Sequence, residues 1–209
     1  MKRTIPFVMI LFLLITVVVA AESTNKYNGY NTVKVIVNNS ELKTDVPAII
    51  MDGRTLLPLR KVAEAVNSIV TWDAANRTAS ILKPQVNIIF AETKDGSTVS
   101  GELSEIIPFW TANEKYLSHI SIGGLPKGKH TLYCGIYSSD KNGNINLSKP
   151  IDSKPEYTVN STSPNTPVWF AIAWDRATIK EAGIYSFVVQ LKDSDGNFNP
   201  IAIYNMELK

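Results

Sequence analysis

The chain is 209 residues long, and its charges nearly balance, with 21 Lys and Arg residues against 19 Asp and Glu residues. This balance excludes the broad basic surface by which proteins bind nucleic acid. Cys134 is the only cysteine, so a disulfide within the chain is excluded too. With only two histidines, the sequence also lacks the ligands for an imidazole-rich metal centre.

An export signal is predicted at residues 1–21. Lys2 and Arg3 give a positive start, residues 5–19 are apolar but for one threonine, and two alanines follow at a cleavage position. The apolar run is as long as the shortest membrane spans, so the alternative is an uncleaved anchor, which would be the only contact with a membrane. Export without disulfides favours a bacterial protein that is secreted or held at the extracellular surface.

Three further segments are predicted. Residues 22–32 are polar and are expected to form a flexible leader. Residues 33–83 form a small first domain, and residues 84–209 form a second domain, with the Lys83-Pro84 step as the boundary between them.

The first domain begins with short strands separated by tight turns. Valine alternation over residues 33–37 predicts a strand, and a second strand is predicted at residues 48–51. The Asn38-Asn39 and Asp52-Gly53 pairs are turn signals, because Asn, Asp and Gly tolerate the positive φ that tight hairpins need.

One helix is predicted after these strands. Pro58 suits the first helical position, where its missing N–H is no loss. Asn67 follows the helix, at a place where a left-handed residue often ends it. Two strands then flank a loop at residues 73–77, which makes the domain an α+β unit. The apolar stripe of the helix is Leu59, Val62, Ala63 and Val66.

An ordered series of residues runs through this unit: Val35 and Val37, Val46-Pro47, Asp52 to Arg60 (D-G-R-T-L-L-P-L-R), Ala63-Glu64-Ala65, and Val70 to Asp73 (V-T-W-D). This series resembles the copper amine oxidase N-terminal-like domain, also called a stalk domain, which is found in exported proteins of Gram-positive bacteria. The resemblance covers residues 33–82 and implies a non-catalytic accessory module. Amine oxidase activity is not expected, because the large catalytic domain and the copper-ligand histidines of such an enzyme are missing from the sequence.

The residues singled out in this motif are interpreted as structural. Arg60 and Glu64 are four residues apart on the predicted helix and are expected to form an ion pair, with a binding site as the alternative. The full set is Asp52, Gly53, Arg54, Pro58, Arg60, Glu64, Trp72 and Asp73.

The second domain is predicted to be an immunoglobulin-like antiparallel β-sandwich. Short alternating or β-branched runs recur between Asp-Gly and Asn-Gly turns, as in all-β sandwiches. The six predicted strands are residues 86–93, 117–122, 131–137, 168–174, 185–191 and 201–208.

Two sets of candidate ligands in this domain favour structural roles. His130 and Cys134 lie on one face of a strand, but no further ligand clusters with them, so they are weak metal candidates and no cofactor is predicted. Asp140 and Asp193 each begin an alternating series of Asp and Asn residues that resembles the start of a calcium loop. The glycines occupy hairpin-turn positions instead, and weak calcium binding stays as the alternative.

Aromatic residues are the remaining candidates for binding. The candidate ligand contacts are Trp110, Phe109 and Tyr116, and Trp110 lies in a predicted loop. The alternative is that they belong to the sandwich core, because core aromatics and ligand-binding aromatics give the same pattern in sequence. Trp174 alternates with Ile172 and is expected in the core. The sequence thus favours a non-catalytic surface or cell-wall-associated protein that binds a cell-wall polymer or another surface protein. The alternatives are a carbohydrate-binding protein that acts through sandwich aromatics and a hydrolase or metal enzyme with an unrecognised site.

Overall fold

The computed structural model describes residues 25–93, 103–106, 115–140, 144–175, 179 and 181–208. Contacts between residues divide the chain into two compact units, one of residues 1–35 with 43–57 and the other of residues 36–42 with 58–209. The domain boundary predicted at Lys83-Pro84 stays a prediction. Within the described residues, no helix has the length and apolar character needed to span a membrane.

The first unit contains a four-stranded antiparallel sheet in the order β1-β2-β5-β6. Two turns build it, Asn28-Gly29 (φ 50° and 86°) and Asp52-Gly53 (φ 49° and 72°), each with the paired positive φ values of a type I′ hairpin. The strands are β1 (Lys26–Tyr27), β2 (Tyr30–Val33), β5 (Ala48–Met51) and β6 (Arg54–Leu56).

The hairpin β1–β2 falls within the range that was predicted as a flexible leader. Asn28-Gly29 turns the chain back on itself, and β2 then pairs with β5 through Val33 and Ala48. The prediction of a flexible leader is therefore wrong for residues 26–32. Strands this short and polar give no clear signal in the sequence, and the pairing of β2 with β5 stabilises them.

The second unit starts with the hairpin of β3 (Ile36–Val37) and β4 (Ser40–Glu41). Asn38 and Asn39 form its turn with φ values of 49° and 65°, which confirms the turn expected there. The Asn38 amide donates a hydrogen bond of 3.5 Å to the carbonyl of Ala65, one of the carbonyls that the helix leaves unpaired at its C-terminal end.

Helix α2 (Leu59–Ala65) ends as predicted but starts one residue late. Pro58 has an extended ψ of 94° and precedes the helix instead of occupying its first position. At the other end Asn67 is left-handed (φ 55°), and the Ser68 N–H donates to the Ala63 carbonyl at 2.8 Å, as in a Schellman motif. Of the predicted apolar stripe, only Ala63 is fully buried, whereas Leu59 is 44% exposed.

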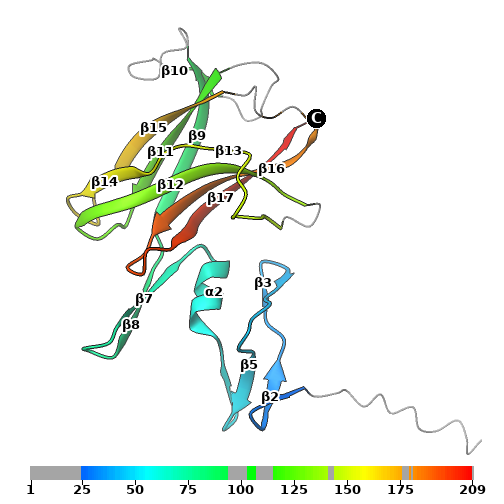
Figure 1. Cartoon of the computed structure of the whole chain (residues 1–209). Coiled ribbons are helices and arrows are strands. Elements are labelled where there is room, and N and C mark those ends of the chain that lie inside the picture. The colour runs from blue at the N-terminus through cyan, green and yellow to red at the C-terminus, as the bar shows by residue number, and fades with distance from the viewer. Residues whose placement is uncertain are drawn as a thin grey trace, which may run out of the picture. The chain divides into compact units, whose positions relative to one another are not determined.

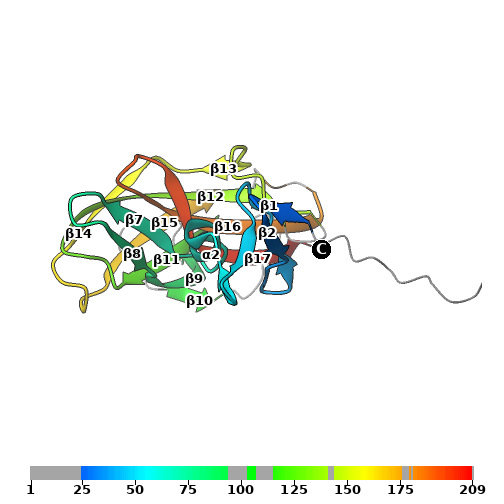
Figure 2. The same cartoon turned by 90° about the horizontal axis from the view of Figure 1, so that it is seen from below.

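The hairpin of β7 (Ile69–Asp73) and β8 (Thr78–Leu82) follows, with its strands side by side in Figures 1 and 2. Ile69 is buried in the core of the sandwich, and Leu82 packs against that core. The tip is exposed, and there Asp73 accepts hydrogen bonds from the backbone N–H and the side-chain amide of Asn76. These bonds lower the pKa of Asp73, the side-chain bond more than the backbone bond.

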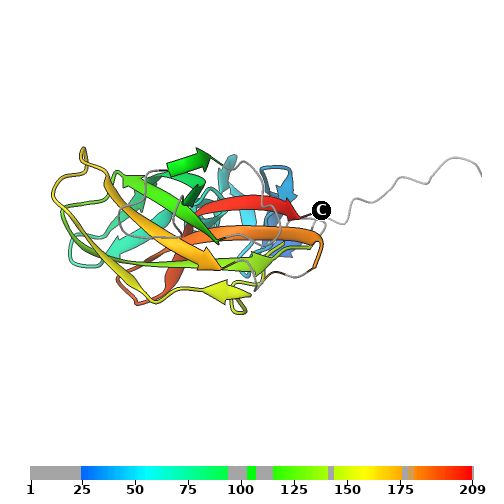
Figure 3. The same ribbon diagram turned by 90° about the horizontal axis from the view of Figure 1, so that it is seen from above.

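The sandwich consists of two antiparallel sheets, and their strands can be followed in Figures 1 and 3. All six predicted strands are present, and the three that were missed, β10, β13 and β14, are short. One sheet has the order β10 (Leu103–Ile106), β9 (Gln85–Thr93), β11 (Lys115–Gly123), β15 (Val168–Asp175). The other has the order β13 (Asp152–Ser153), β12 (Gly128–Ser138), β16 (Gly183–Lys192), β17 (Phe198–Leu208), and β14 (Tyr157–Ser161) also pairs with β12.

The strand order confirms the immunoglobulin-like prediction. Strands β9, β11 and β15 share one sheet and β12, β16 and β17 the other, as strands A, B, E and C, F, G do in immunoglobulin domains. Tyr185, near the start of β16, donates a hydrogen bond of 2.7 Å to the carbonyl of Glu181. This is the tyrosine corner, which precedes strand F of such domains.

Aromatic rings fill the core between the two sheets. Trp174 from β15 meets Phe187 from β16 edge-on, with centroids 5.2 Å apart, and Phe90 from β9 meets the same ring at 5.3 Å. The Trp174 indole N–H donates to the hydroxyl of Ser118 at 2.8 Å, which satisfies the polar end of a side chain that is only 1% exposed. The expected core position of Trp174 is confirmed.

Candidate functional site

Cys134 and His130 lie on the same side of β12, but both have structural surroundings. Cys134 is completely buried in the sandwich core, and this burial raises the pKa of its thiol to about 12. His130 lies near the start of the strand, where its Nε2 is 2.7 Å from the carbonyl oxygen of Pro126. No group of three or more His, Cys, Asp or Glu side chains within the described ranges could hold a metal ion.

The two Asp-rich loops hold their aspartates in turns. Asp193 accepts hydrogen bonds from the N–H groups of Asp195 and Asn197 and from the amide of Asn199. Partial burial raises the pKa of Asp193, but these hydrogen bonds outweigh burial and leave the pKa below its ordinary value. Asp140 likewise accepts from the N–H and the amide of Asn144. Each carboxylate thus caps its own loop.

The three aromatic residues predicted as ligand contacts stay untested. Phe109 and Trp110 lie outside the described residues. The backbone of Tyr116 is in β11, paired with Trp174 and Glu92, but its side chain also falls outside the described part. The prediction that these three residues contact a ligand therefore stays a prediction.

Trp169, by contrast, stands on the outer face of the sandwich. On β15 the side chains of Phe170, Ile172 and Trp174 point to the core, so Trp169 points to the opposite side and is 77% exposed. The alternation that places Trp174 in the core therefore also places Trp169 on the opposite face of the strand.

Strand register places an amide and a hydroxyl in line with this indole. Trp169 is directly opposite Ser121 of β11, which is opposite Asn87 of β9. Directly paired residues of an antiparallel sheet point to the same face, so the three side chains form a line across the sheet, here called the Trp169 row. The three strands that carry it, β9, β11 and β15, can be followed in Figure 1.

The neighbouring rows set the limits of this surface. The row on one side contains Gln85 and its partner Gly123. Pro167 lies next to Gly123, because a Cβ added at Gly123 would be 3.9 Å from the proline ring. The row on the other side contains Ile89, His119 and Ala171. Beyond that row, Ala91 and Leu117 are buried although they belong to the outer face. The exposed side chains of this face, Gln85, Asn87, Ile89, Pro167 and Trp169, therefore lie in three rows, here called the open rows.

His119 adds an unsatisfied group to this face. Its Nε2 is buried and has no hydrogen-bond partner among the residues that the structure describes. Buried polar atoms are nearly always paired, so a buried nitrogen without a partner is costly. No signal in the sequence connects His119 with Trp169.

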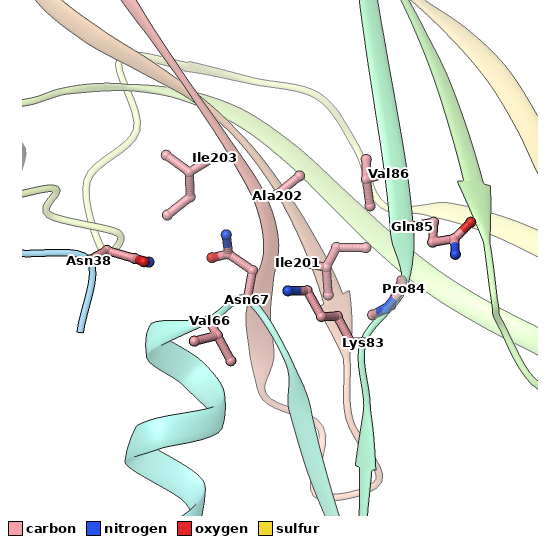
Figure 4. Close-up of a pocket in the computed structure, with 10 residues that line it drawn as sticks. All are labelled: Asn38, Val66, Asn67, Lys83, Pro84, Gln85, Val86, Ile201, Ala202 and Ile203. Carbon is pink, nitrogen blue, oxygen red and sulfur yellow. The ribbon is translucent and has the colours of Figure 1, made fainter.

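A cleft of about 590 Å³ lies within the second unit, at the C-terminal end of α2. In Figure 4 the Lys83 ammonium and the Asn67 amide extend into the same space beside Ile201, whereas the Gln85 amide points away. The lining offers a cation, two Asn amides and aliphatic side chains, and it includes no carboxylate, thiol or imidazole. Its two Asn residues already have backbone tasks, Asn67 as the left-handed end of α2 and Asn38 in the β3–β4 turn.

The motif residues of the first domain are mostly exposed and serve the backbone. Asp52 and Gly53 form the β5–β6 turn, and Arg54 begins β6. Glu64 pairs with Lys61 at 2.8 Å instead of with Arg60 as predicted, because on this short helix the i, i+3 partner lies within reach. Trp72 is 58% exposed on the β7–β8 hairpin.

Comparison with known proteins identifies the first part of the chain. Residues 36–107 match the family model of the copper amine oxidase N-terminal domain. The chain therefore carries a domain of this kind over a segment of about a third of its length, which confirms the resemblance seen in the sequence. The match continues past residue 82 and takes in β9, the first strand of the sandwich. The comparison with curated proteins gave no match.

Proposed function

We propose that this protein is a non-enzymatic, exported surface or cell-wall-associated protein whose β-sandwich binds a ligand or another surface protein. The stalk-like domain acts as the carrier of the sandwich. One observation carries the proposal, namely that a 77% exposed tryptophan stands on the open outer face of a regular sheet. Large apolar groups on an accessible surface are unfavourable in water, and tryptophan is enriched where proteins recognise their partners.

The surroundings of the reactive side chains support a binding role. Burial raises the pKa of Cys134 to about 12, which leaves a thiol rather than a thiolate at neutral pH. Burial also raises the pKa of Tyr137 to about 12, and its hydroxyl donates to Gln190 at 2.9 Å. These groups stabilise the sandwich core. The family match concerns only the N-terminal domain of copper amine oxidases, so amine oxidation is not part of the proposal.

Fractionation of the producing cells tests the location. We expect the protein in the wall fraction or the medium, and finding it only in the cytosol would contradict the proposal. Metal analysis of the purified chain tests the non-enzymatic part. A stoichiometric transition metal would favour the metal-enzyme alternative instead.

A further inference from the structure

The outer face of the β9–β11–β15 sheet has two different borders. Its β15 border carries Pro167 and the exposed indole of Trp169, whereas its β9 border carries the exposed amides of Gln85 and Asn87. Between them β11 contributes small residues, among them Ser121. Apart from His119, the three open rows contain no ionisable side chain. An aromatic surface thus lies beside neutral hydrogen-bonding groups.

This combination matches the chemistry of a sugar ring. A pyranose with equatorial hydroxyls has an apolar face of C–H groups, which packs on an aromatic ring, and a rim of hydroxyls, which pairs with amides and hydroxyls. We propose that the Trp169 row binds a neutral, β-linked polysaccharide, with one sugar stacked on Trp169 and the next hydrogen-bonded to Ser121 and Asn87. The inference rests on the proposed function and names the ligand of its binding face.

The dimensions of the row fit two successive sugars. Neighbouring strands are ~4.8 Å apart, so Trp169 and Asn87, two strands apart, are separated by ~10 Å, which is about the length of a disaccharide. The three open rows span ~14 Å along the strands, since each row is two residues from the next. The chain of sugars therefore runs across the strands, along the Trp169 row.

The same dimensions argue against a protein partner. Between their outermost backbone positions the three rows measure only ~10 Å by ~14 Å, whereas a stable protein interface buries ~800 Å² of accessible surface on each side. The face cannot grow along the strands toward the C-terminal end of β9, because Ala91 and Leu117 are already buried there. A narrow polymer needs far less area than a folded partner or a second copy of this chain.

Depletion binding to cellulose and chitin, two neutral β-linked polysaccharides, tests the proposal. The full chain, purified from an exporting bacterial host, is compared with Trp169→Ala, Trp169→Leu and Asn87→Ala. The matched control is Trp72→Ala, which removes another exposed tryptophan, 58% accessible, from the β7–β8 hairpin. We expect retention on at least one polymer, a loss of about 10-fold or more for both Trp169 variants, and about 3-fold or more for Asn87→Ala. Trp72→Ala should bind like the wild type.

Several results would overturn the glycan site. These are no retention on any of the polymers, equal losses for the Trp72 and Trp169 variants, or full binding by Trp169→Leu, which would show nonspecific apolar adhesion. If a Trp169 variant fails to fold, Trp72→Phe protein supplies a second measurement. A saturating concentration of a hexasaccharide of the retained polymer must then reduce the quenching of this protein's tryptophan fluorescence by iodide. Unchanged quenching would refute the stacking of a sugar on Trp169. A wall-located protein without glycan binding would refute this site alone, whereas a cytosolic glycan-binding protein would refute the proposed function.

Discussion

Replacing Tyr185 with phenylalanine tests whether the tyrosine corner stabilises the sandwich. The change keeps the ring and removes the hydroxyl that donates to the Glu181 carbonyl at 2.7 Å. A typical hydrogen bond contributes about 1 kcal/mol net, and larger losses arise when the remaining partner is buried. This bond is only partly buried and Glu181 is an exposed residue, so we expect a loss of about 1 kcal/mol. For a domain of this size that lowers Tm by roughly 3–5 °C.

Urea unfolding followed by tryptophan fluorescence measures this loss. Trp174 is a suitable reporter, because it is buried in the fold and becomes exposed on unfolding. Tyr204→Phe is the matched control, since it deletes the hydroxyl of an exposed tyrosine on β17. We expect a lower urea midpoint for Tyr185→Phe with an unchanged m value, and no shift for the control.

The pH dependence of the same difference provides the refuting result. Burial, with a smaller contribution from the negative charge of Glu181, raises the pKa of Tyr185 above its ordinary value of 10.0. A raised phenol pKa means that the folded state keeps the proton longer, so the stabilisation is present below pH 10 and is lost as the pH rises above it. The wild type should therefore approach Tyr185→Phe in alkaline solution. Equal stability of the two at pH 7, or a gap that widens above pH 10, would refute the tyrosine corner.

Three further predictions concern single positions. Asn67→Val should destabilise the chain by about 1 kcal/mol in urea unfolding, because a β-branched residue resists the left-handed backbone at φ 55°, and Asn67→Gly should not. Asp193→Ala should lower the free energy of unfolding by about 1 kcal/mol at pH 7. Because the pKa of Asp193 is lowered in the folded state, the difference in stability between the wild type and the variant should disappear as the pH falls below 3.8. A difference that persists in acid would contradict the capping role of the carboxylate. The Cys134 thiol, with its pKa raised to about 12, should resist thiol reagents at pH 8 in the native protein and react fully in urea; rapid native labelling would show that it is accessible.

The successes of sequence reasoning came from local signals. Asp52-Gly53 and Asn38-Asn39 were recognised as turns because positive φ is a property of those residue types, and Asn67 was placed at the helix end for the same reason. The six long sandwich strands were recognised because apolar side chains alternate along them. The family resemblance also rested on such ordered local features, and the family match confirms it.

Other features depended on partners far along the chain. The β1–β2 hairpin was missed because β5 holds it, and β14 was missed because its five mostly polar residues form a strand only against β12. Glu64 was assigned to Arg60, but side-chain geometry on a short helix selected Lys61. Each of these features depends on contacts that sequence spacing alone does not identify.

The sequence by itself determined where the chain turns, which residues alternate, and that its first part is a copper amine oxidase N-terminal-like domain. It also determined that Cys134 has no partner cysteine. It also indicated that Trp174 faces the core, as the structure confirms. Only the tertiary structure decided which residues of neighbouring strands lie side by side, and so it brought Ser121 and Asn87 into line with the exposed indole of Trp169. The physical reason is that alternation along one strand defines its two faces, whereas the pairing of distant strands sets their register.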